Sequence, residues 1–282
     1  MSKTIAITGC SSGFGRATAL HMASRGWRVF ASVRKEADGD SLLSEASERG
    51  SAEFVTPLVC DITSAAQVSA MGRSIAEAAP GLDALLNNAG TAFPAPLELL
   101  PLDALRSQLE VNLIGHLSVT QTLLPLLKAA RGTIINVTSV GGRIALPLIG
   151  AYNASKFAME AVSDVLRFEL APFGVRVVVI EPGTSATSIW ETSVNRANEL
   201  LGERADVKPY VPLIDSVNNH FREDVKHGFP VRLFADTVEK ILDNPHPRTR
   251  YQIPRSVTWT IRLRNLMPDL LWDRMMRRAL KL

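Results

Sequence analysis

The chain alternates between short apolar runs and longer amphipathic stretches from its first residues to about residue 180. Apolar runs such as Arg28–Val33 and Val175–Ile180 are typical of strands buried on both faces, as in a parallel sheet. The stretches between them have helical spacing. The expected strands are Thr4–Thr8, Arg28–Val33, Phe54–Cys60, Leu82–Asn87, Gly132–Thr138 and Val175–Ile180, with a further short one at Tyr251–Ile253. The expected helices are Gly13–Arg25, Asp40–Arg49, Ala65–Ala79, Asp103–Ala130 and Ala151–Ala171. This alternation predicts the α/β class, with one doubly wound parallel sheet and helices on both faces.

The regular pattern ends after Pro182. Residues 184–230 have mixed polarity and scattered aromatic residues, which predicts a long insertion that covers a ligand site at the carboxyl end of a strand. No internal repeat or linker divides the sequence, so we expect residues 1–282 to form a single domain of Rossmann type with a C-terminal substrate-covering region.

The last part of the chain is a basic amphipathic tail, residues 255–282. It holds seven Arg or Lys and two Asp, a charge of +5 in a chain whose net charge is +3, so residues 1–254 carry −2. Such a tail can lie on an anionic membrane as a peripheral contact. It can equally pack beside the substrate entrance or a partner subunit, and packing is favoured because stripes of Trp and Leu usually belong to a core.

The composition is that of an ordinary globular protein, with 46% hydrophobic and 21% charged residues. No apolar run approaches the ~18 residues of a membrane-spanning helix, and Met1–Ile5 leads straight into a strand without a signal-peptide pattern. Cys10 and Cys60 are expected to end strands two positions apart in the sheet, beyond disulfide reach. A cytoplasmic protein is therefore expected. The body lacks a basic face, so nucleic acid is not an expected partner.

A glycine-rich loop, Thr8-Gly9-Cys10-Ser11-Ser12-Gly13-Phe14-Gly15, joins the first strand to the first helix. Glycines there let the backbone approach a pyrophosphate, which a helix N-terminus favours. A plain turn with packing glycines is the simpler alternative. A third interpretation is the nucleophile elbow of a serine hydrolase, with Ser11 as nucleophile. Only eight residues precede the motif, and the candidate bases His220, His227 and His246 lie in irregular stretches, so the hydrolase remains a minor alternative.

The end of the second strand indicates which dinucleotide would bind. NAD sites usually carry an acidic residue there for the ribose hydroxyl, whereas NADP sites carry a basic one for the 2′-phosphate. The sequence reads Ser32-Val33-Arg34-Lys35, with no acid before Glu36. NADP(H) is favoured, with Arg34 as the phosphate ligand and NAD(H) still possible. The alternative is that Arg34 is an ordinary solvated cation.

The sequence Tyr152-Asn153-Ala154-Ser155-Lys156 places a tyrosine and a lysine four residues apart, on one face of a helix. A phenol with a pKa near ~10 is a poor base at neutral pH, and a nearby cation moves that pKa toward the working range. Ser139 lies thirteen residues earlier, at the carboxyl end of the fifth strand.

These motifs resemble the short-chain dehydrogenase/reductase family, in order, over nearly the whole of the first 190 residues. The family's Thr-Gly-x-x-x-Gly-x-Gly signature matches Thr8 to Gly15. Its Asn-Asn-Ala-Gly stretch matches Asn87 to Gly90, and its Pro-Gly after the sixth strand matches Pro182-Gly183. Asn112, Ser139, Tyr152 and Lys156 match its catalytic residues. The resemblance implies an NAD(P)-dependent alcohol dehydrogenase or ketoreductase.

In that resemblance Tyr152 is the general acid or base, and Lys156 lowers its pKa and binds the nicotinamide ribose. Ser139 binds the substrate oxygen, and Asn112 positions a water. The implied cofactor-binding residues are Thr8, Gly9, Ser11, Ser12, Gly13, Phe14, Gly15, Arg34, Asp61, Ile62, Asn88, Ala89, Gly90, Tyr152, Lys156, Pro182, Gly183 and Thr187. Ser185 departs from the family, which usually has an apolar residue there.

The Ser-Ser-Gly-Phe-Gly variant and the Phe168 helix look most like the retinol dehydrogenase and 17β-hydroxysteroid dehydrogenase branch. Independently, Ile144–Ile149 together with Phe93, Pro94, Pro96 and Trp190 are candidates to line an apolar pocket, although core packing would explain them too. The expected substrate is a small hydrophobic alcohol or ketone. The resemblance also implies a homodimer or homotetramer built partly on residues 103–130 and 151–171.

Three further interpretations concern chemistry. A catalytically silent dinucleotide sensor would keep the fold without turnover. An epimerase or dehydratase would recycle its cofactor with no net change. The spacing of histidine and cysteine predicts no metal site.

Overall fold

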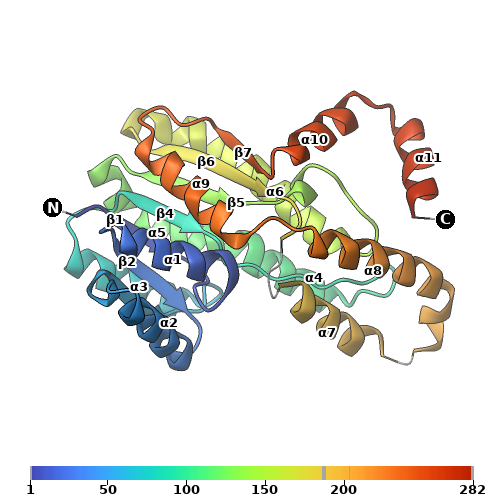
Figure 1. Cartoon of the computed structure of the whole chain (residues 1–282), viewed down its shortest axis with the longest axis horizontal. Helices are drawn as coiled ribbons and strands as arrows, with labels where there is room; N and C mark the ends of the chain where they lie inside the picture. The colour runs from blue at the N-terminus through green and yellow to red at the C-terminus, as the bar shows by residue number, and fades with distance from the viewer. Residues whose placement is uncertain (1, 186–188, 203, 281–282) are drawn as a thin grey trace.

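The computed structural model describes residues 2–185, 189–202 and 204–280, and it is built on one seven-stranded sheet (Figure 1). The strands are β1 (Thr4–Ile7), β2 (Arg28–Val33), β3 (Val55–Val59), β4 (Ala84–Asn87), β5 (Thr133–Val137), β6 (Arg176–Pro182) and β7 (Arg250–Ile253). Their order is β3-β2-β1-β4-β5-β6-β7, and every neighbouring pair is parallel. This arrangement confirms the predicted Rossmann-type sheet.

Helices cover both faces of the sheet. One layer consists of α1 (Gly13–Ser24), α2 (Glu36–Glu48) and α9 (Val231–Asp243), and the other consists of α3 (Ala65–Ala78), α5 (Gly115–Ala130) and α6 (Gly150–Leu170). In β1, Ile5 and Ile7 belong to the core under the first layer, while Ala6 faces the core under the second. Because alternate residues of a strand point to opposite faces, this double burial explains the continuous apolar runs.

The direction in which the chain progresses across the sheet reverses at β1. The chain moves outward through β2 and β3 and then crosses back to β4 on the other side of β1. In open α/β sheets, ligands bind at such a switch point, in the crevice outside the carboxyl ends of the strands. The loops after β1 and β4 meet there: Thr8 Oγ1 accepts hydrogen bonds from the amides of Asn88 and Ala89, at 2.9 and 3.0 Å.

Two predicted helices differ in detail from those observed. α2 begins at Glu36, four residues before its predicted start. The stretch 103–130 is not one continuous helix, because a π-helical turn, Glu110–Ile114, separates α4 (Leu102–Leu109) from α5. Such turns are frequent at functional sites, and this one carries Asn112.

The expectation that residues 184–230 are irregular is wrong. They contain α7 (Ile189–Leu201), a 3₁₀ segment, Ala205–Tyr210, and α8 (Val211–Lys226). Pro212 suggests a helix break, but it lies in the first turn of α8, where its missing N–H costs nothing. The helix α9, which the sequence analysis did not assign, packs along α1 with Phe234, Val238 and Ile241 buried.

The basic tail forms two helices, α10 (Ser256–Leu266) and α11 (Asp269–Ala279), which leave the sheet after β7 as an arm (Figure 1). Pro268 caps the start of α11 and separates the two. Among the described residues, no helix combines the length and the apolar character needed to cross a bilayer.

Candidate active site

A cleft of about 680 Å³ lies at the switch point, and most of the predicted site residues line it. Sixteen of them do so: Gly9, Ser11, Ser12, Gly13, Phe14, Arg34, Asp61, Ile62, Asn88, Ala89, Gly90, Ser139, Tyr152, Lys156, Pro182 and Gly183. Thr8, Gly15 and Asn112 are buried and do not line the cleft. Thr187 lies outside the described residues.

The glycine loop has the close packing that a phosphate-binding turn requires. Gly9 has a φ of 73°, and a Cβ there would come within 2.8 Å of the Cα of Ala89. A Cβ on Gly15 would lie 2.2 Å from the carbonyl oxygen of Gly9. Only glycine fits at both positions, because a side chain would collide with the backbone of the neighbouring loop segment.

The N-terminal turn of α1 opens onto the cleft, since Ser12, Gly13 and Phe14 all line it. The first amides of a helix have no intrahelical acceptor, and its dipole favours an anion. Phe14 anchors the turn by stacking with Phe229 and Phe234, whose ring centroids lie 5.6 and 4.3 Å away. The loop thus fits the pyrophosphate of a dinucleotide.

Two of the predicted cofactor-binding residues line the cleft just after the ends of β2 and β3. Arg34 follows β2, is exposed, and has no carboxylate within ion-pair distance among the residues that the structure describes. Asp61 follows β3, and its Oδ1 accepts hydrogen bonds from the backbone and hydroxyl of Thr63, at 2.9 and 2.7 Å. Asp61 itself lines the cleft.

Ser139, Tyr152 and Lys156 meet at the carboxyl edge of β5. The side chains of Ser139 and Tyr152 share a hydrogen bond. The Lys156 ammonium lies 5.7 Å from the centre of the Tyr152 ring and donates to the carbonyl of Val137 at 2.9 Å. The Ser139 hydroxyl is itself held by the amide of Gly141 at 3.0 Å. A strand end and one helical turn thus bring the predicted catalytic side chains together.

Burial controls the protonation of this group. It raises the pKa of Tyr152 above its usual value, and the hydrogen bond from Ser139 opposes that rise. Burial lowers the pKa of Lys156 to about 8, while the Glu160 carboxylate acts to raise it. The net shift of the Tyr152 pKa is upward, because loss of solvation outweighs the hydrogen bond with Ser139. At neutral pH Tyr152 is a proton donor.

Asn112 is fully buried on the π-helical turn and connects three segments. Its Oδ1 accepts from the amide of Thr91 at 2.9 Å, and its Nδ2 donates to the carbonyl of Thr91 at 3.0 Å and to Ser155 Oγ at 3.1 Å. Because its side-chain groups are used in these bonds, Asn112 fixes the loop after β4 against α6.

An acidic pair beneath Lys156 was not identified from the sequence. Glu160 lies one turn further along α6, accepts from Thr138 Oγ1 at 2.6 Å and pairs with Arg250 at 3.1 Å. Glu181 is completely buried and pairs with Arg143 at 3.1 Å and Arg250 at 3.4 Å. The spacing of Lys156 and Glu160, four residues apart on one helix, was the sequence signal that could have identified Glu160. The contact between Glu160 and Arg250 spans 90 residues, so no local sequence pattern predicts it.

Arg196 of α7 was also missed. Its guanidinium reaches across the cleft, bonds to Thr91 Oγ1 and lies 5.1 Å from the ring centre of Phe93. Burial and the neighbouring Arg34 lower its pKa. Four cationic side chains line the cleft against two acidic ones, Asp61 and Glu110, and this excess of positive charge favours an anionic ligand. The sequence signal was only one basic residue in an insertion of mixed polarity.

The predicted apolar pocket is only partly present. Phe93 lines the cleft, but none of Ile144–Ile149 does; Ile144 is buried against the C-terminal arm instead, and Leu146 packs beside it. Pro96 is buried and does not line the cleft. The side chain of Trp190 is not among the parts that the structure describes. Ile144 and Leu146 therefore pack against α10 and α11 and do not line the cleft. The local sequence does not specify this long-range packing.

Ser185, which departs from the family pattern, has a structural role. Its hydroxyl donates to the carbonyl of Phe229 at 2.8 Å, and the two residues form a parallel bridge. This contact ties the chain after β6 to the segment before α9.

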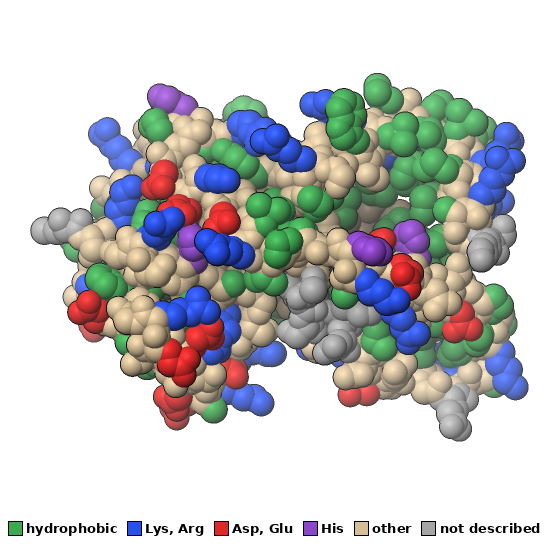
Figure 2. Space-filling model, viewed as in Figure 1, with side chains coloured by type: hydrophobic (Ala, Val, Ile, Leu, Met, Phe, Trp, Pro, Cys, Tyr) green, Lys and Arg blue, Asp and Glu red, His purple; other side chains and the backbone are tan. Residues whose placement is uncertain are grey.

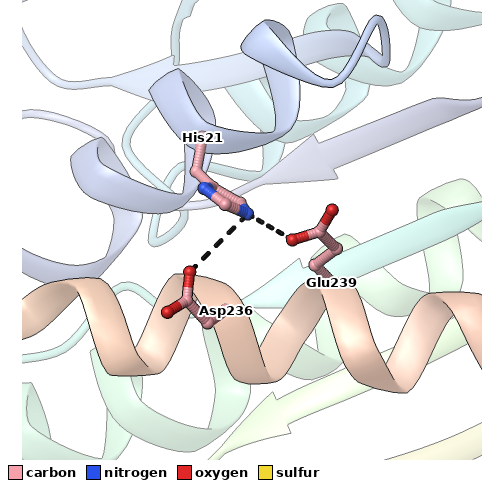
Figure 3. A group of neighbouring side chains, drawn as sticks. All are labelled: His21, Asp236 and Glu239. Atoms are coloured by element: carbon pink, nitrogen blue, oxygen red, sulfur yellow. Dashed lines mark hydrogen bonds and ion pairs between the residues drawn. The ribbon is translucent and has the colours of Figure 1, made fainter.

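One cluster of potential metal ligands occurs among the described residues, away from the cleft. His21 of α1 points between Asp236 and Glu239 of α9 (Figure 3), with Nε2 2.7 Å from Glu239 and 3.9 Å from Asp236. Arg25 pairs with Glu239 at 2.8 Å and Arg232 with Asp236 at 3.8 Å. Because both carboxylates already have cationic partners, the cluster serves as an ion-pair network between the two helices.

The hydrolase interpretation lacks a base. Ser11 lines the cleft, but no histidine is part of that lining in the described chain. His220 is exposed and lies 3.6 Å from Asp224, and His227 and His246 are exposed as well. Cys10 and Cys60 are free and buried, in agreement with the predicted absence of a disulfide between them.

Known proteins share both sequence and fold with this chain. A family model described as short chain dehydrogenase matches residues 3–198. Human retinol dehydrogenase 16 is 38% identical over 294 residues, covering 97% of this chain and 87% of its own length. Human 17-beta-hydroxysteroid dehydrogenase type 6 is 35% identical over 266 residues, covering 88% and 80%.

Two solved structures extend the comparison. A short chain dehydrogenase/reductase from Burkholderia phymatum in complex with NAD superposes with a TM-score of 0.80 at 25% identity, covering 94% of this chain and 93% of that one. A short chain dehydrogenase from Burkholderia cenocepacia in complex with NADP has a TM-score of 0.72 at 27% identity, covering 97% of each. With its sheet order, its glycine cradle and the meeting of Ser139, Tyr152 and Lys156, the chain belongs to the short-chain dehydrogenase family, in the branch of the retinol dehydrogenases, and is an NAD(P)-dependent dehydrogenase or reductase.

Proposed function

We propose that the protein is an NADP(H)-dependent oxidoreductase that interconverts a hydrophobic secondary alcohol and its ketone, or an aldehyde. The observation that carries the proposal is the meeting of Ser139, Tyr152 and Lys156 beside a glycine-lined cleft. Relatives named for retinol and for 17β-hydroxysteroids support the hydrophobic substrate class.

In the reduction direction, the hydroxyls of Ser139 and Tyr152 donate hydrogen bonds to the substrate carbonyl oxygen. The nicotinamide, when bound, supplies the hydride to the carbonyl carbon. Tyr152 then gives its proton to the developing alkoxide, and the Lys156 ammonium stabilises the phenolate that remains. Oxidation reverses each step, with the phenolate of Tyr152 removing the hydroxyl proton. Asn112 acts as a positioning residue for the loop at Thr91.

The cofactor preference is tested at Arg34. Arg34→Glu is expected to raise the Kd of NADPH by about 100-fold, because it removes a charge-assisted bond to the 2′-phosphate and adds a repulsive carboxylate. The Kd of NADH, which has no such phosphate, should change by less than about threefold. Fluorescence titration of both cofactors measures the difference.

Lys35→Glu is the matched control, since Lys35 has the same charge and is exposed beside Arg34 but does not line the cleft. It should leave both affinities nearly unchanged. Equal losses of NADPH and NADH affinity in Arg34→Glu would contradict the role of Arg34 in choosing between them.

The substrate class is tested with a panel of ketones that vary in apolar size and in charge. We expect turnover with NADPH to increase with apolar size, and polyhydroxylated sugars to be poor substrates. Each ketone is paired with an analogue bearing a remote carboxylate, because Arg196 offers a cation beside Phe93. Preference for charged sugars over hydrophobic ketones would overturn the proposed class.

The same assay separates the alternatives. A dinucleotide sensor would bind NADPH tightly without turnover on any ketone. An epimerase or dehydratase would convert substrate with no net loss of NADPH. The complete set of Ser139, Tyr152 and Lys156 supports redox turnover, since binding alone does not require it.

We also propose a homodimer or homotetramer, located in the cytoplasm. Exposed apolar side chains on α6 and around α4 and α5 support self-association there, namely Leu102, Ile114, Phe157, Val165 and Phe168. The two buried free thiols are compatible with a reducing compartment.

A further inference from the structure

The C-terminal arm has an inner face that is firmly packed. Val257 and Ile261 of α10 and Trp272 of α11 are buried, in contact with Ile144 and partly buried Leu146 of the segment after Ser139. Ser216 of α8 adds a hydrogen bond to the carbonyl of Leu280 at 2.6 Å. These contacts fix how the arm sits on the body and therefore which side of it faces outward.

The outer face of the arm is apolar. On α10, Trp259, Leu263 and Leu266 follow helical spacing and lie on the side opposite Val257 and Ile261. Trp259 is 69% exposed and Leu266 is 85% exposed. α11 adds Leu270, Leu271 and Met275 to the same list of exposed large apolar side chains, and Figure 2 shows such side chains gathered over the arm. Exposed apolar side chains gathered in this way mark an interaction surface.

Arginines surround this apolar face. Arg255, Arg262, Arg274, Arg277 and Arg278 are exposed, and within the described ranges none has a carboxylate within ion-pair distance. Among the described residues of the arm, only Arg264 forms such a pair, with Asp269 at 2.6 Å. Apolar side chains flanked by unneutralised cations are the pattern of helices that lie in the interface of an anionic membrane.

A small pocket lies at the base of the arm. It has a volume of about 190 Å³ and is lined by Arg248, Gln252, Arg255, Thr258, Trp259 and Arg262. The guanidinium of Arg262 lies 5.3 Å from the centre of the Trp259 ring. Three arginines and no carboxylate in one pocket match a phosphate group, since guanidinium binds phosphate with charge-assisted bonds.

We propose that the outer face of α10 and α11 docks on an anionic phospholipid surface, with a headgroup phosphate in the pocket of Arg248, Arg255 and Arg262. Trp259 borders both the pocket and the apolar face, so it would lie at the boundary between headgroups and acyl chains. The contact is peripheral, because neither helix can cross a bilayer. The proposal stands independently of the substrate.

A second copy of the chain fits this surface less well. A two-fold interface brings the same patch of both subunits together, so the exposed arginines of one arm would face those of the other. The charge of +5 in residues 255–282, against −2 in the remainder, instead favours an anionic partner.

Flotation of the full chain with lipid vesicles tests the proposal. We expect the protein to float with vesicles of phosphatidylcholine containing one third phosphatidylglycerol, not with phosphatidylcholine alone, and to be released by salt. Arg255→Gln with Arg262→Gln should lower the partition coefficient by about 10- to 30-fold. Trp259→Ser with Leu266→Ser should lower it by at least about tenfold.

The control is Arg73→Gln with Val59→Ser, an exposed pair on α3 and β3, at the opposite edge of the sheet from the arm. It should float like the unchanged protein, and thermal unfolding of all variants should be similar, which separates docking from folding.

Three results would overturn the proposal. The first is the absence of flotation with anionic vesicles. The second is a combination of two observations: millimolar inorganic phosphate abolishes flotation at constant ionic strength, and the Trp259→Ser with Leu266→Ser variant floats normally. This result would mean that the pocket binds a soluble anion and not a lipid headgroup. The third is a lower molar mass of that variant by light scattering, without flotation of the unchanged protein, which would make the arm an interface between copies.

Discussion

Replacing Tyr152 by phenylalanine is expected to lower kcat for ketone reduction by about 10²- to 10⁴-fold, the usual contribution of a general acid. The substitution removes only the hydroxyl that shares a hydrogen bond with Ser139. The aromatic ring and its position beside Lys156 stay. The Kd of NADPH should change by less than about threefold, so stopped-flow turnover and fluorescence titration together separate chemistry from binding.

Tyr210→Phe is the matched control, because Tyr210 is another tyrosine whose hydroxyl bonds to a carboxylate, Glu98, outside the cleft. It should leave kcat unchanged. If Tyr152→Phe kept more than a tenth of the activity, the proton would have to travel by another group and the proposed mechanism would be wrong.

The sheet and its layers could be predicted because burial leaves a local pattern in the sequence. Strands covered on both faces, such as Arg28–Val33, are apolar at most positions regardless of which helices cover them. The helix α9 had an equally clear pattern, with Phe234, Val238, Ile241 and Leu242 buried at helical spacing. The apolar spacing of residues 231–243 is therefore a sufficient local signal for this helix.

The site was predictable where short motifs hold its residues. The glycine loop and the Tyr152–Lys156 pair each lie on one turn of chain, so their geometry follows from spacing. Arg196 and Arg250 could not be found in this way, because each reaches the site from an element far along the chain. The same reason explains why Ile144 packs against the arm and not in the cleft: its partners, Val257, Ile261 and Trp272, are more than 100 residues away.

The substitution Lys156→Met is expected to change activity and stability in opposite directions. Burial lowers the pKa of Lys156 from 10.5 to about 8, which means that the folded protein holds this proton less tightly than the unfolded chain does. The difference corresponds to about 3 kcal/mol. Below pH 8 the lysine is charged in both states, so the whole penalty of burying the ammonium is present; it is relieved as the pH rises from 8 toward 10.5.

At pH 7 methionine removes that penalty and also the bond to the carbonyl of Val137, which contributes about 1 kcal/mol. The free energy of unfolding of the variant should therefore be about 2 kcal/mol higher than that of the unchanged protein. This corresponds to a rise in Tm of roughly 4 to 8 °C in scanning calorimetry. Turnover should fall by at least about 100-fold, because the phenolate of Tyr152 loses its cation. Lys240→Met, at an exposed position on α9, is the control and should change neither quantity.

The pH dependence of stability is a second test of the buried charge at Lys156. The free energy of unfolding of the unchanged protein should rise between pH 8 and pH 10 relative to that of Lys156→Met, so the gain in Tm of the variant should shrink over this interval. A lower Tm of Lys156→Met at pH 7 would mean that Glu160 and Val137 stabilise the ammonium more than burial destabilises it. A gain that shrinks with pH, together with the lost turnover, would mean that the fold keeps a destabilising charge at this position because the proton transfer at Tyr152 requires it.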